Sequence, residues 1–164
     1  MTGSFDGGHS TGDPEYGSTT TFGSTSFTGF GWQLVALHVT STGTIDWAVS
    51  AGGAGEDQVS AIISDGSGGA VVMGRFEGTA AFGSTTLTSA GECDIVVFHV
   101  TSTGIIDWAV SAGGAGFDGG VAMVSDGTTP DGLGGGAWVT GRFQGTAAFG
   151  STSTSTTAPP PPPP

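Results

Sequence analysis

The residues best suited to acid–base chemistry in this chain are its histidines, because the imidazole pKa lies near neutral pH. His38 and His99 occupy the same position in two copies of one segment, His-Val-Thr-Ser-Thr-Gly. A catalytic histidine would be expected once, in a unique setting. Their recurrence inside apolar strands therefore favours a packing or hydrogen-bonding role for both. His9 stands alone in a loop and indicates no function.

The dipeptide Asp46-Trp47 also recurs, at 107–108. An accessible tryptophan could form a shelf on which a sugar or a base stacks. The structural alternative is a core tryptophan beside an aspartate that caps a turn or pairs with Arg75 or Arg142. We favour the structural alternative.

Calcium is the metal that acidic, glycine-rich loops suit best, since it takes about six to eight oxygen ligands. Such loops occur at Asp57, Asp65, Asp118, Asp126 and Asp131. None of them matches the spaced Asp-x-Asp-x-Asp-Gly pattern with a later Glu, and turn chemistry accounts for single Asp-Gly pairs equally well. Structural calcium stays an alternative, and no metal-binding residue is assigned.

Neither zinc binding nor nucleophilic catalysis is indicated. One cysteine and three scattered histidines lack zinc-ligand spacing, and the chain has no Gly-x-Ser-x-Gly elbow or phosphate-binding loop. A catalytic thiol needs a positive neighbour to lower its pKa, whereas Cys93 lies between Glu92 and Asp94. The sequence therefore predicts no catalytic residue, no cofactor-binding residue and no cofactor.

The elements that carry these residues are repeated. Ile45–Gly55 returns unchanged as Ile106–Gly116, and His38–Gly43 returns as His99–Gly104, both at a spacing of 61 residues. Self-similarity at a fixed period indicates one supersecondary unit stacked against its copies. The chain therefore consists of repeat units rather than unrelated segments.

Phe-Gly-Ser-Thr motifs at Phe22, Phe82 and Phe149 mark where successive units begin. The resulting divisions are 1–21, the tail of a preceding repeat plus a loop; 22–81, the first unit; 82–148, the second unit; and 149–164, the start of a third unit that runs into a Ser/Thr/Pro-rich tail. A tail of this composition suits an extended stalk, often glycosylated.

Two segments break the period and are predicted to be loops, 9–21 and 128–136. Insertions in repeat proteins map to loops, often on the binding face. If the protein binds a partner, these loops are the expected place. The candidate binding residues in them are Asp13, Glu15, Tyr16, Asp131 and Leu133.

Each complete unit is predicted to contain four short strands, which are rich in Val, Ile, Phe or Trp and bounded by Gly, Ser or Asp. In the second copy they are Val59–Ser64, Ala70–Phe76, Ile95–Ser102 and Ile106–Ser111. No segment shows a sustained helical period. The fold class is therefore all-β.

Two features of these strands predict how they connect and pack. The stretch Asp65–Gly69 fits a tight hairpin connection, and Thr103-Gly104 fits the next turn. The runs at 34–37 and 95–98 are apolar at consecutive positions. A half-exposed strand would alternate, so these strands are expected to be covered on both faces.

Charge excludes several partners. The chain has 14 Asp and Glu against two Arg and no Lys, with a formal net charge of -12. Nucleic acid and anionic membrane surfaces would be repelled, and no apolar stretch is long enough to insert into a membrane. Protein, glycan, further repeat units or a second copy are the partners left open. The Ser/Thr/Pro-rich tail favours an extracellular or cell-surface location.

The second copy resembles the bacterial-type beta-propeller repeat, known as the SBBP repeat. The residues that carry the resemblance are Asp57, Val59–Asp65, Gly68–Phe76, Gly78–Gly83, Ile106-Asp107-Trp108-Ala109 and Gly113-Gly114. The resemblance implies antiparallel four-stranded units stacked as part of a β-propeller, with about two and a quarter blades present. Because propellers close with about four to eight blades, this chain is not expected to close alone. It would be a fragment, a truncated gene model, a piece that assembles with other copies, or an open array of repeats. The family is a scaffold without shared catalytic residues, so no activity is implied.

The function expected from the sequence is that of a non-enzymatic scaffold or interaction module within a larger surface or secreted protein. One alternative is part of a propeller-based hydrolase or lyase acting on glycans, since one fold hosts many functions. Another is a repeat adhesin stabilised by calcium.

Overall fold

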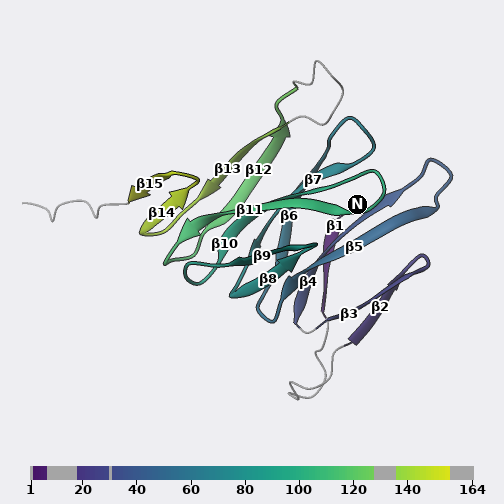
Figure 1. The fold of residues 1–164 in the computed structure, drawn as a ribbon, viewed down its shortest axis with the longest axis horizontal. Helices are drawn as coiled ribbons and strands as arrows, with labels where there is room; N and C mark the ends of the chain where they lie inside the picture. Colours follow the sequence, from purple (N-terminus) through teal and green to yellow (C-terminus); the bar gives the residue numbers. More distant parts are fainter. Residues whose placement is uncertain (1, 7–17, 30, 128–135, 156–164) are drawn as a thin grey trace, which may run out of the picture.

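The computed structural model describes residues 2–6, 18–29, 31–127 and 136–155. The described chain is built of β-strands and contains no helix, so the predicted all-β class is confirmed (Figure 1). The candidate loop residues lie outside the described residues: Asp13, Glu15, Tyr16, Asp131 and Leu133.

The strands follow one another with short connections. Their bounds are β1 (Thr2–Asp6), β2 (Ser18–Phe22), β3 (Thr25–Gly29), β4 (Trp32–Val39), β5 (Ile45–Gly53), β6 (Gln58–Ser64), β7 (Ala70–Phe76), β8 (Thr79–Phe82), β9 (Thr85–Thr88), β10 (Asp94–Val100), β11 (Ile106–Gly114), β12 (Gly119–Ser125), β13 (Ala137–Arg142), β14 (Thr146–Phe149) and β15 (Thr152–Ser155). All pairings between these strands are antiparallel.

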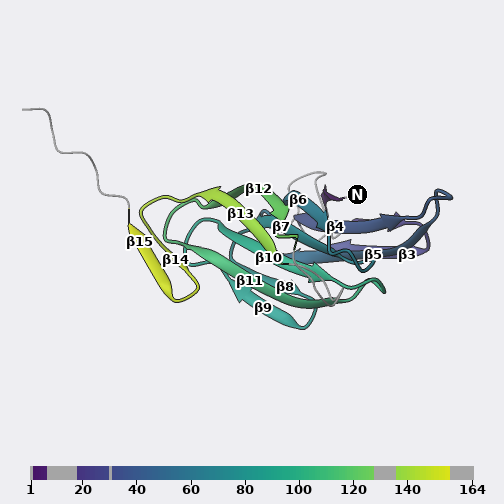
Figure 2. The same ribbon diagram turned by 90° about the horizontal axis from the view of Figure 1, so that it is seen from above.

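The four predicted strands of the complete unit are confirmed as β6, β7, β10 and β11. They lie next to one another in a six-stranded sheet with the order β15-β14-β11-β10-β7-β6. Counted by their strands, the first unit runs from β1 to β5, the second and complete unit from β6 to β11, and the third from β12 to β15, so each extends across one Phe-Gly-Ser-Thr division. The first unit contributes β1, β4 and β5 to a five-stranded sheet, and the third contributes the β12–β13 pair. None of these sheets closes on itself. The view from above places β14–β15 at one end of the molecule and β3 with β5 at the other (Figure 2).

Each unit contains a second hairpin that the sequence analysis missed. The Phe-Gly-Ser-Thr motif is the turn of this hairpin: Phe82 pairs with Thr85, and Gly83 takes a φ of 62° between them. Glycine adopts a positive φ without strain, which a two-residue hairpin turn requires. The first strand of the hairpin, β8, pairs with the end of β5 from the preceding unit. The hairpin therefore joins neighbouring units through backbone hydrogen bonds.

The central strand β10 is covered on both faces, as its consecutive apolar residues predict. Val96 and Phe98 belong to one buried cluster, which includes Leu34 from the first unit. Ile95 faces the other way, into a second cluster with Met123 from the third unit. Successive units thus pack face to face, with an apolar core on each side of the complete unit.

Candidate functional site

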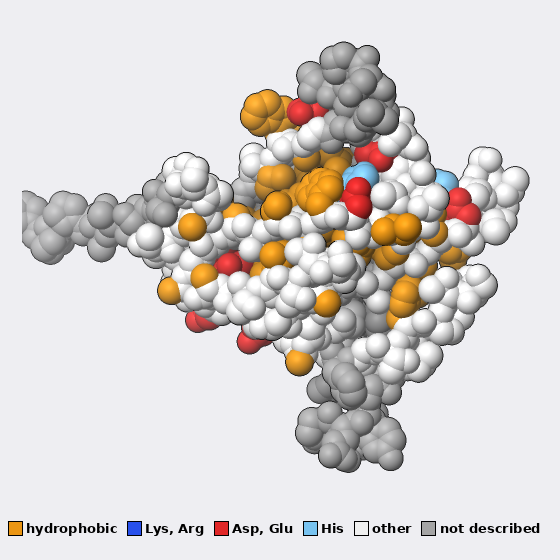
Figure 3. All heavy atoms as spheres, viewed as in Figure 1, with side chains coloured by type: hydrophobic (Ala, Val, Ile, Leu, Met, Phe, Trp, Pro, Cys, Tyr) orange, Lys and Arg blue, Asp and Glu red, His pale blue; other side chains and the backbone are white. Residues whose placement is uncertain are grey.

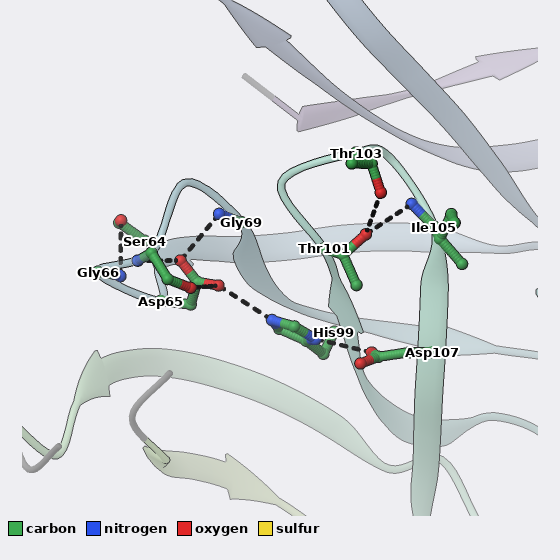
Figure 4. A network of polar contacts seen from close by, with 10 residues as sticks. Ser64, Asp65, Gly66, Gly69, His99, Thr101, Thr103, Ile105 and Asp107 are labelled. Atoms are coloured by element: carbon green, nitrogen blue, oxygen red, sulfur yellow. Dashed lines mark hydrogen bonds and ion pairs between the residues drawn. The ribbon is translucent and has the colours of Figure 1, made fainter. Parts of the chain in front are cut away.

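The most developed polar network surrounds His99 (Figure 4). Its Nδ1 lies 2.7 Å from an Asp107 oxygen and its Nε2 lies 3.1 Å from an Asp65 oxygen. Carboxylates accept hydrogen bonds, so satisfying both contacts requires a proton on each ring nitrogen. Burial lowers the pKa of His99, but the hydrogen bonds that its ring donates to Asp107 and Asp65 outweigh this effect, so the pKa is raised. The geometry therefore favours the imidazolium form of His99, which lies between two carboxylates.

Asp65 anchors the β6–β7 turn as well as His99. Its Oδ1 accepts the backbone amides of Ser67 at 2.8 Å and Gly69 at 2.9 Å, and its Oδ2 accepts the Ser67 hydroxyl at 2.7 Å. Burial raises the pKa of Asp65, but these hydrogen bonds and His99 outweigh it and set the pKa at about 2. The predicted hairpin connection is confirmed, and its aspartate is fully used by the fold.

The histidine–tryptophan–aspartate arrangement recurs in the first unit. The Nδ1 of His38 donates a hydrogen bond to the Asp46 carboxylate at 2.8 Å, and the ring stacks on Trp47 with centroids 5.9 Å apart. His99 stacks on Trp108 at 5.7 Å. The predicted hydrogen-bonding role of both histidines is confirmed, because each forms a hydrogen bond with the aspartate of the Asp-Trp dipeptide on the neighbouring strand of its hairpin.

Pairing with arginine, one of the two roles expected for those aspartates, does not occur among the described residues; Asp46 accepts the backbone amide of Trp47 at 3.0 Å. Arg75 and Arg142 instead both lie over the ring of Phe117, at 4.9 Å and 5.6 Å from its centroid. The expectation that both tryptophans are core residues also fails for Trp108, which is 40% exposed. Trp47, in contrast, packs against the first buried cluster. The second unit covers Trp47, whereas the described residues of the third unit leave Trp108 partly exposed.

Buried aspartates mark the junctions between units. Asp57 accepts the Gly53 amide at 2.7 Å, and its repeat counterpart Asp118 accepts the Gly114 amide at 2.6 Å. The second oxygen of Asp118 accepts the amide of Gln144 at 2.9 Å. Among the described residues, no three His, Cys, Asp or Glu side chains converge as a metal-binding group.

Asp94 is a buried carboxyl that faces a second carboxyl. Its Oδ2 accepts the Ala90 amide at 3.1 Å, while its Oδ1 has no partner among the residues described. Burial raises the pKa of Asp94; the Ala90 amide lowers it, and the charge of Asp118 raises it further. At the equivalent position of the first unit, the neutral amide of Gln33 donates to the Gly53 carbonyl at 2.6 Å. The ionised form of Asp94 is therefore less suited to this site than an amide.

We expect Asp94→Asn to raise the free energy of unfolding by about 1 kcal/mol at about pH 8. A carboxyl whose pKa is raised by folding contributes stability below its unfolded pKa and loses it as the pH rises through the folded value. The substitution removes the charge responsible for that loss. Urea denaturation of both proteins should show the gain at about pH 8 and little difference at about pH 3. A variant less stable than the parent at the higher pH would contradict this account.

Cys93 is buried and free. Burial raises the pKa of its thiol, and the acidic side chains of Glu77, Glu56 and Glu92 act in the same direction, against the opposing charge of Arg75. The thiol form of Cys93 is therefore favoured over the thiolate.

Two of the hollows in the described surface include residues already singled out from the sequence. One, of about 300 Å³, lies between Trp47 with His38 of the first unit and Ile62 to Ala70 of the second. The other, of about 170 Å³, lies where β4 and β6 begin and β7 ends, and its lining residues are Trp32, Glu56, Asp57, Gln58 and Arg75. Of these residues, the sequence marks out Asp57 as a turn or calcium residue, and it gives no sign that the other four lie together with it.

Comparison with known proteins gives no relative: no protein family, curated protein or solved structure matches this chain. Within the described residues, no helix is long and apolar enough to cross a membrane.

Proposed function

We propose that this protein is a non-enzymatic β-repeat scaffold and interaction module, of the bacterial-type beta-propeller repeat kind, within a larger surface or secreted protein. Its interaction surface would be the open face of the third unit, and the occupant a unit of the same repeat supplied by a second copy of this chain. The observation that carries this proposal is a difference in burial between residues that are equivalent in the repeat.

Equivalent apolar residues of the second and third units differ in how far they are buried. Ile63 and Val71 on the second unit pack in the cluster that Met123 of the third unit completes. Their repeat counterparts on β12 and β13 are Val124, which is exposed, and Trp138, which is 68% exposed. A face that is covered in one unit is thus uncovered in the next. Figure 3 shows hydrophobic side chains gathered over the region of β12, beside His and acidic side chains.

The two Asp-Trp dipeptides support the same interpretation. Trp47 lies against the β10–β11 turn of the following unit, where a Cβ on Gly104 would stand 2.8 Å from the Trp47 Cβ. Within the described residues Trp108 has no such turn over it, and the third unit there shows β12 and β13 but no counterparts of β10 and β11. A further unit stacked on the third would cover Trp108 and Trp138 together. Exposed apolar patches of this kind mark interaction sites.

The charge of the chain determines how this association should respond to salt. With a net charge of -12, two copies repel each other. About 1 M salt screens such repulsion within roughly 3 Å and strengthens apolar contacts. A head-to-tail contact between unlike faces can also continue from copy to copy. The expected behaviour is therefore self-association that grows with both protein and salt concentration.

We expect replacement of Val124 and Trp138 by serine to weaken self-association roughly tenfold or more, because it removes the apolar face. Sedimentation velocity over a range of protein concentrations, at low salt and at about 1 M NaCl, measures this directly. Ile105→Thr is the matched control. It removes an exposed apolar side chain outside the proposed interface, and it introduces the residue type that the first unit has at the equivalent position, Thr44. A parent protein that stays monomeric throughout, or a double variant that associates like the parent, would overturn the proposal.

A further inference from the structure

Two strands far apart in the chain share the motif Thr-Gly-x-Phe. Residues 2–5 of β1 read Thr-Gly-Ser-Phe, and residues 140–143, at the end of β13, read Thr-Gly-Arg-Phe. Both correspond to residues 73–76 of β7, which pairs with β6 on one side and with β10 on the other. Among the described strands, β1 pairs only with the counterpart of β10, which is β4, and β13 only with the counterpart of β6, which is β12. The two strands are therefore complementary in the neighbours that they lack.

The register of these pairings is the same in both units. Phe76 of β7 pairs with Asp94, and Phe5 of β1 pairs with Gln33, which corresponds to Asp94 in the repeat. β7 pairs with all seven residues of β10, whereas the pairing of β1 with β4 covers only residues 32–36. In the same register, β13 would pair with β4 as far as the last residue of that strand. β13 would therefore cover more of the β4 edge than β1 does.

His38 lies beyond the point where the β1 ladder stops, and its surroundings differ from those of His99. The side chain of His38 is 48% exposed, against 16% for His99. His99 uses both ring nitrogens, whereas His38 hydrogen-bonds through Nδ1 alone among the described residues. The Nε2 partner of His99 is Asp65 in the β6–β7 turn, and its neighbour on β7 is Val71. The described part of the first unit contains no counterpart of that turn or of Val71.

The β12–β13 hairpin of the third unit holds both of the groups that are missing around His38. Its turn begins with Asp126, the counterpart of Asp65, and the Asp126 amide donates to the Gly136 carbonyl at 3.1 Å, as that of Asp65 does to Gly69 at 3.2 Å. A Cβ on Gly136 would stand 2.7 Å from the Asp126 Oδ2, and one on Gly69 would stand 2.5 Å from the Asp65 Oδ2. The two carboxylates are therefore placed alike in their turns. β13 then carries a tryptophan at the position of Val71.

That tryptophan, Trp138, matches the hollow of about 300 Å³ beside His38 and Trp47. Directly paired residues of neighbouring strands share one face of a sheet, and His38 pairs with Trp47. On the edge of β4, Trp138 would pair with His38 and would lie on this face, where the hollow opens. A cavity of about 150 Å³ accommodates benzene, so the hollow has room for the larger indole ring.

The complete unit separates this hairpin from β4 of its own chain. The first and third units pack on opposite faces of the complete unit, through Leu34 in one buried cluster and Met123 in the other. We infer that the β12–β13 hairpin of one copy pairs with β4 of a second copy in place of β1, and so completes a four-stranded unit from two chains. This inference rests on the proposed self-association and identifies the strands that make it.

The exchange replaces one ladder by another and adds two contacts. β1 and β13 offer β4 the same backbone groups in the same register, which is the low-cost route of domain swapping. Trp138, which is 68% exposed in the single chain, would leave solvent for the hollow. Asp126 would lie opposite Nε2 of His38, in the place that Asp65 has opposite His99.

The test is a disulfide between β4 of one copy and β13 of another. Two preparations, both with Cys93→Ser, carry Val39→Cys or Ala137→Cys at the positions that the register places opposite each other. They are mixed at about 1 M NaCl and oxidised with glutathione disulfide. We expect a cross-linked dimer with one chain of each kind, identified by mass. Thr140→Cys in place of Ala137→Cys is the control, because it lies roughly 10 Å out of register along the strand and should give at most about one tenth of that dimer.

A second measurement fixes β1 in place. Thr2 pairs with Ala36, so Thr2→Cys with Ala36→Cys in one chain, again with Cys93→Ser, can join β1 to β4 by an intrachain disulfide. Because β1 and β13 compete for the same edge, the oxidised protein should self-associate roughly tenfold or more weakly than the same protein after reduction. Sedimentation velocity before and after addition of dithiothreitol measures the difference.

The results separate this inference from the proposed function. A protein that associates but forms no cross-link between Val39→Cys and Ala137→Cys overturns the strand exchange and leaves face-to-face stacking standing. Equal cross-linking in the matched and control pairs, or association that the β1 disulfide leaves unchanged, has the same consequence. A protein that stays monomeric at low salt and at about 1 M NaCl overturns both.

Discussion

Replacing Phe82 with alanine should destabilise the protein by about 3–5 kcal/mol. Phe82 is fully buried, and its ring lies 5.6 Å from those of Phe76 and Phe98, at an edge-on angle to the first. It comes from the β8–β9 hairpin, whereas its two neighbours come from β7 and β10. The substitution therefore leaves a cavity where the hairpin meets the sheet, and it removes aromatic contacts besides buried area.

The chain provides a matched control for this substitution in Phe149, which has the same repeat position. Phe149 is 37% exposed and contacts Phe143 at 5.8 Å. Phe149→Ala should cost at most about 1 kcal/mol, because little buried area is lost. Urea denaturation of the two variants and the parent measures both effects. Equal losses from the two substitutions would show that the hairpin of the second unit contributes no more to the core than the hairpin of the third.

The repeat period and the apolar runs sufficed to predict most of the complete unit. The unchanged segment Ile106–Gly116 forms the same kind of strand in both copies, β5 and β11, and the run at 95–98 favours a strand with cover on both faces. Glycine-rich connections such as Asp65–Gly69 then fixed where the strands turn. These features are local in the sequence, so the sequence reveals them.

The extra hairpin escaped prediction because its strands carry almost no hydrophobic signal. In β8 and β9 most residues are Thr or Ala, and Phe82 with Leu87 supply nearly all the apolar contact. A readable signal was nevertheless present: Gly83-Ser84 is a two-residue turn between two short alternating stretches. Interpreting the motif as the start of a unit concealed its role as a turn.

The partners of the polar residues could not be predicted, because strand register determines them. His99 meets Asp65, which is 34 residues away, only once β10 lies beside β7. Likewise, Trp32 and Arg75 line one hollow from different strands. What the sequence does contain is the departure from the repeat at Glu56, where the second copy has phenylalanine. Comparing copies for differences, rather than for identities, would have found that hollow.

Asp65→Ala should lower the free energy of unfolding by about 2–4 kcal/mol. The side chain accepts four hydrogen bonds, from the Ser67 amide and hydroxyl, the Gly69 amide and the His99 ring. Its removal leaves a buried amide at Gly69 unpaired and takes one carboxylate from His99. Ser67→Ala is a milder control, since it removes one hydrogen bond at an exposed residue and should cost about 1 kcal/mol or less.

The same substitution should change the pH dependence of stability. Because folding raises the pKa of His99, its ion pairs contribute fully below the unfolded histidine pKa of about 6.5. That contribution is lost as the pH rises through the folded value of His99. The lowered pKa of Asp65 keeps the pair charged until the pH falls towards about 2. The difference in unfolding free energy between the parent and Asp65→Ala should therefore be larger at about pH 5 than at about pH 9.

Asp57 and Asp94 have raised pKa values, which also make stability fall as the pH rises. Their effects cancel when the unfolding free energy of Asp65→Ala is subtracted from that of the parent at the same pH. Asp107→Ala tests the other side of His99: it removes one charge from a more exposed position and should give a smaller pH-dependent difference. Urea denaturation of the three proteins at both pH values measures these differences. If the difference between the parent and Asp65→Ala is the same at both pH values, His99 is not held as an imidazolium by Asp65.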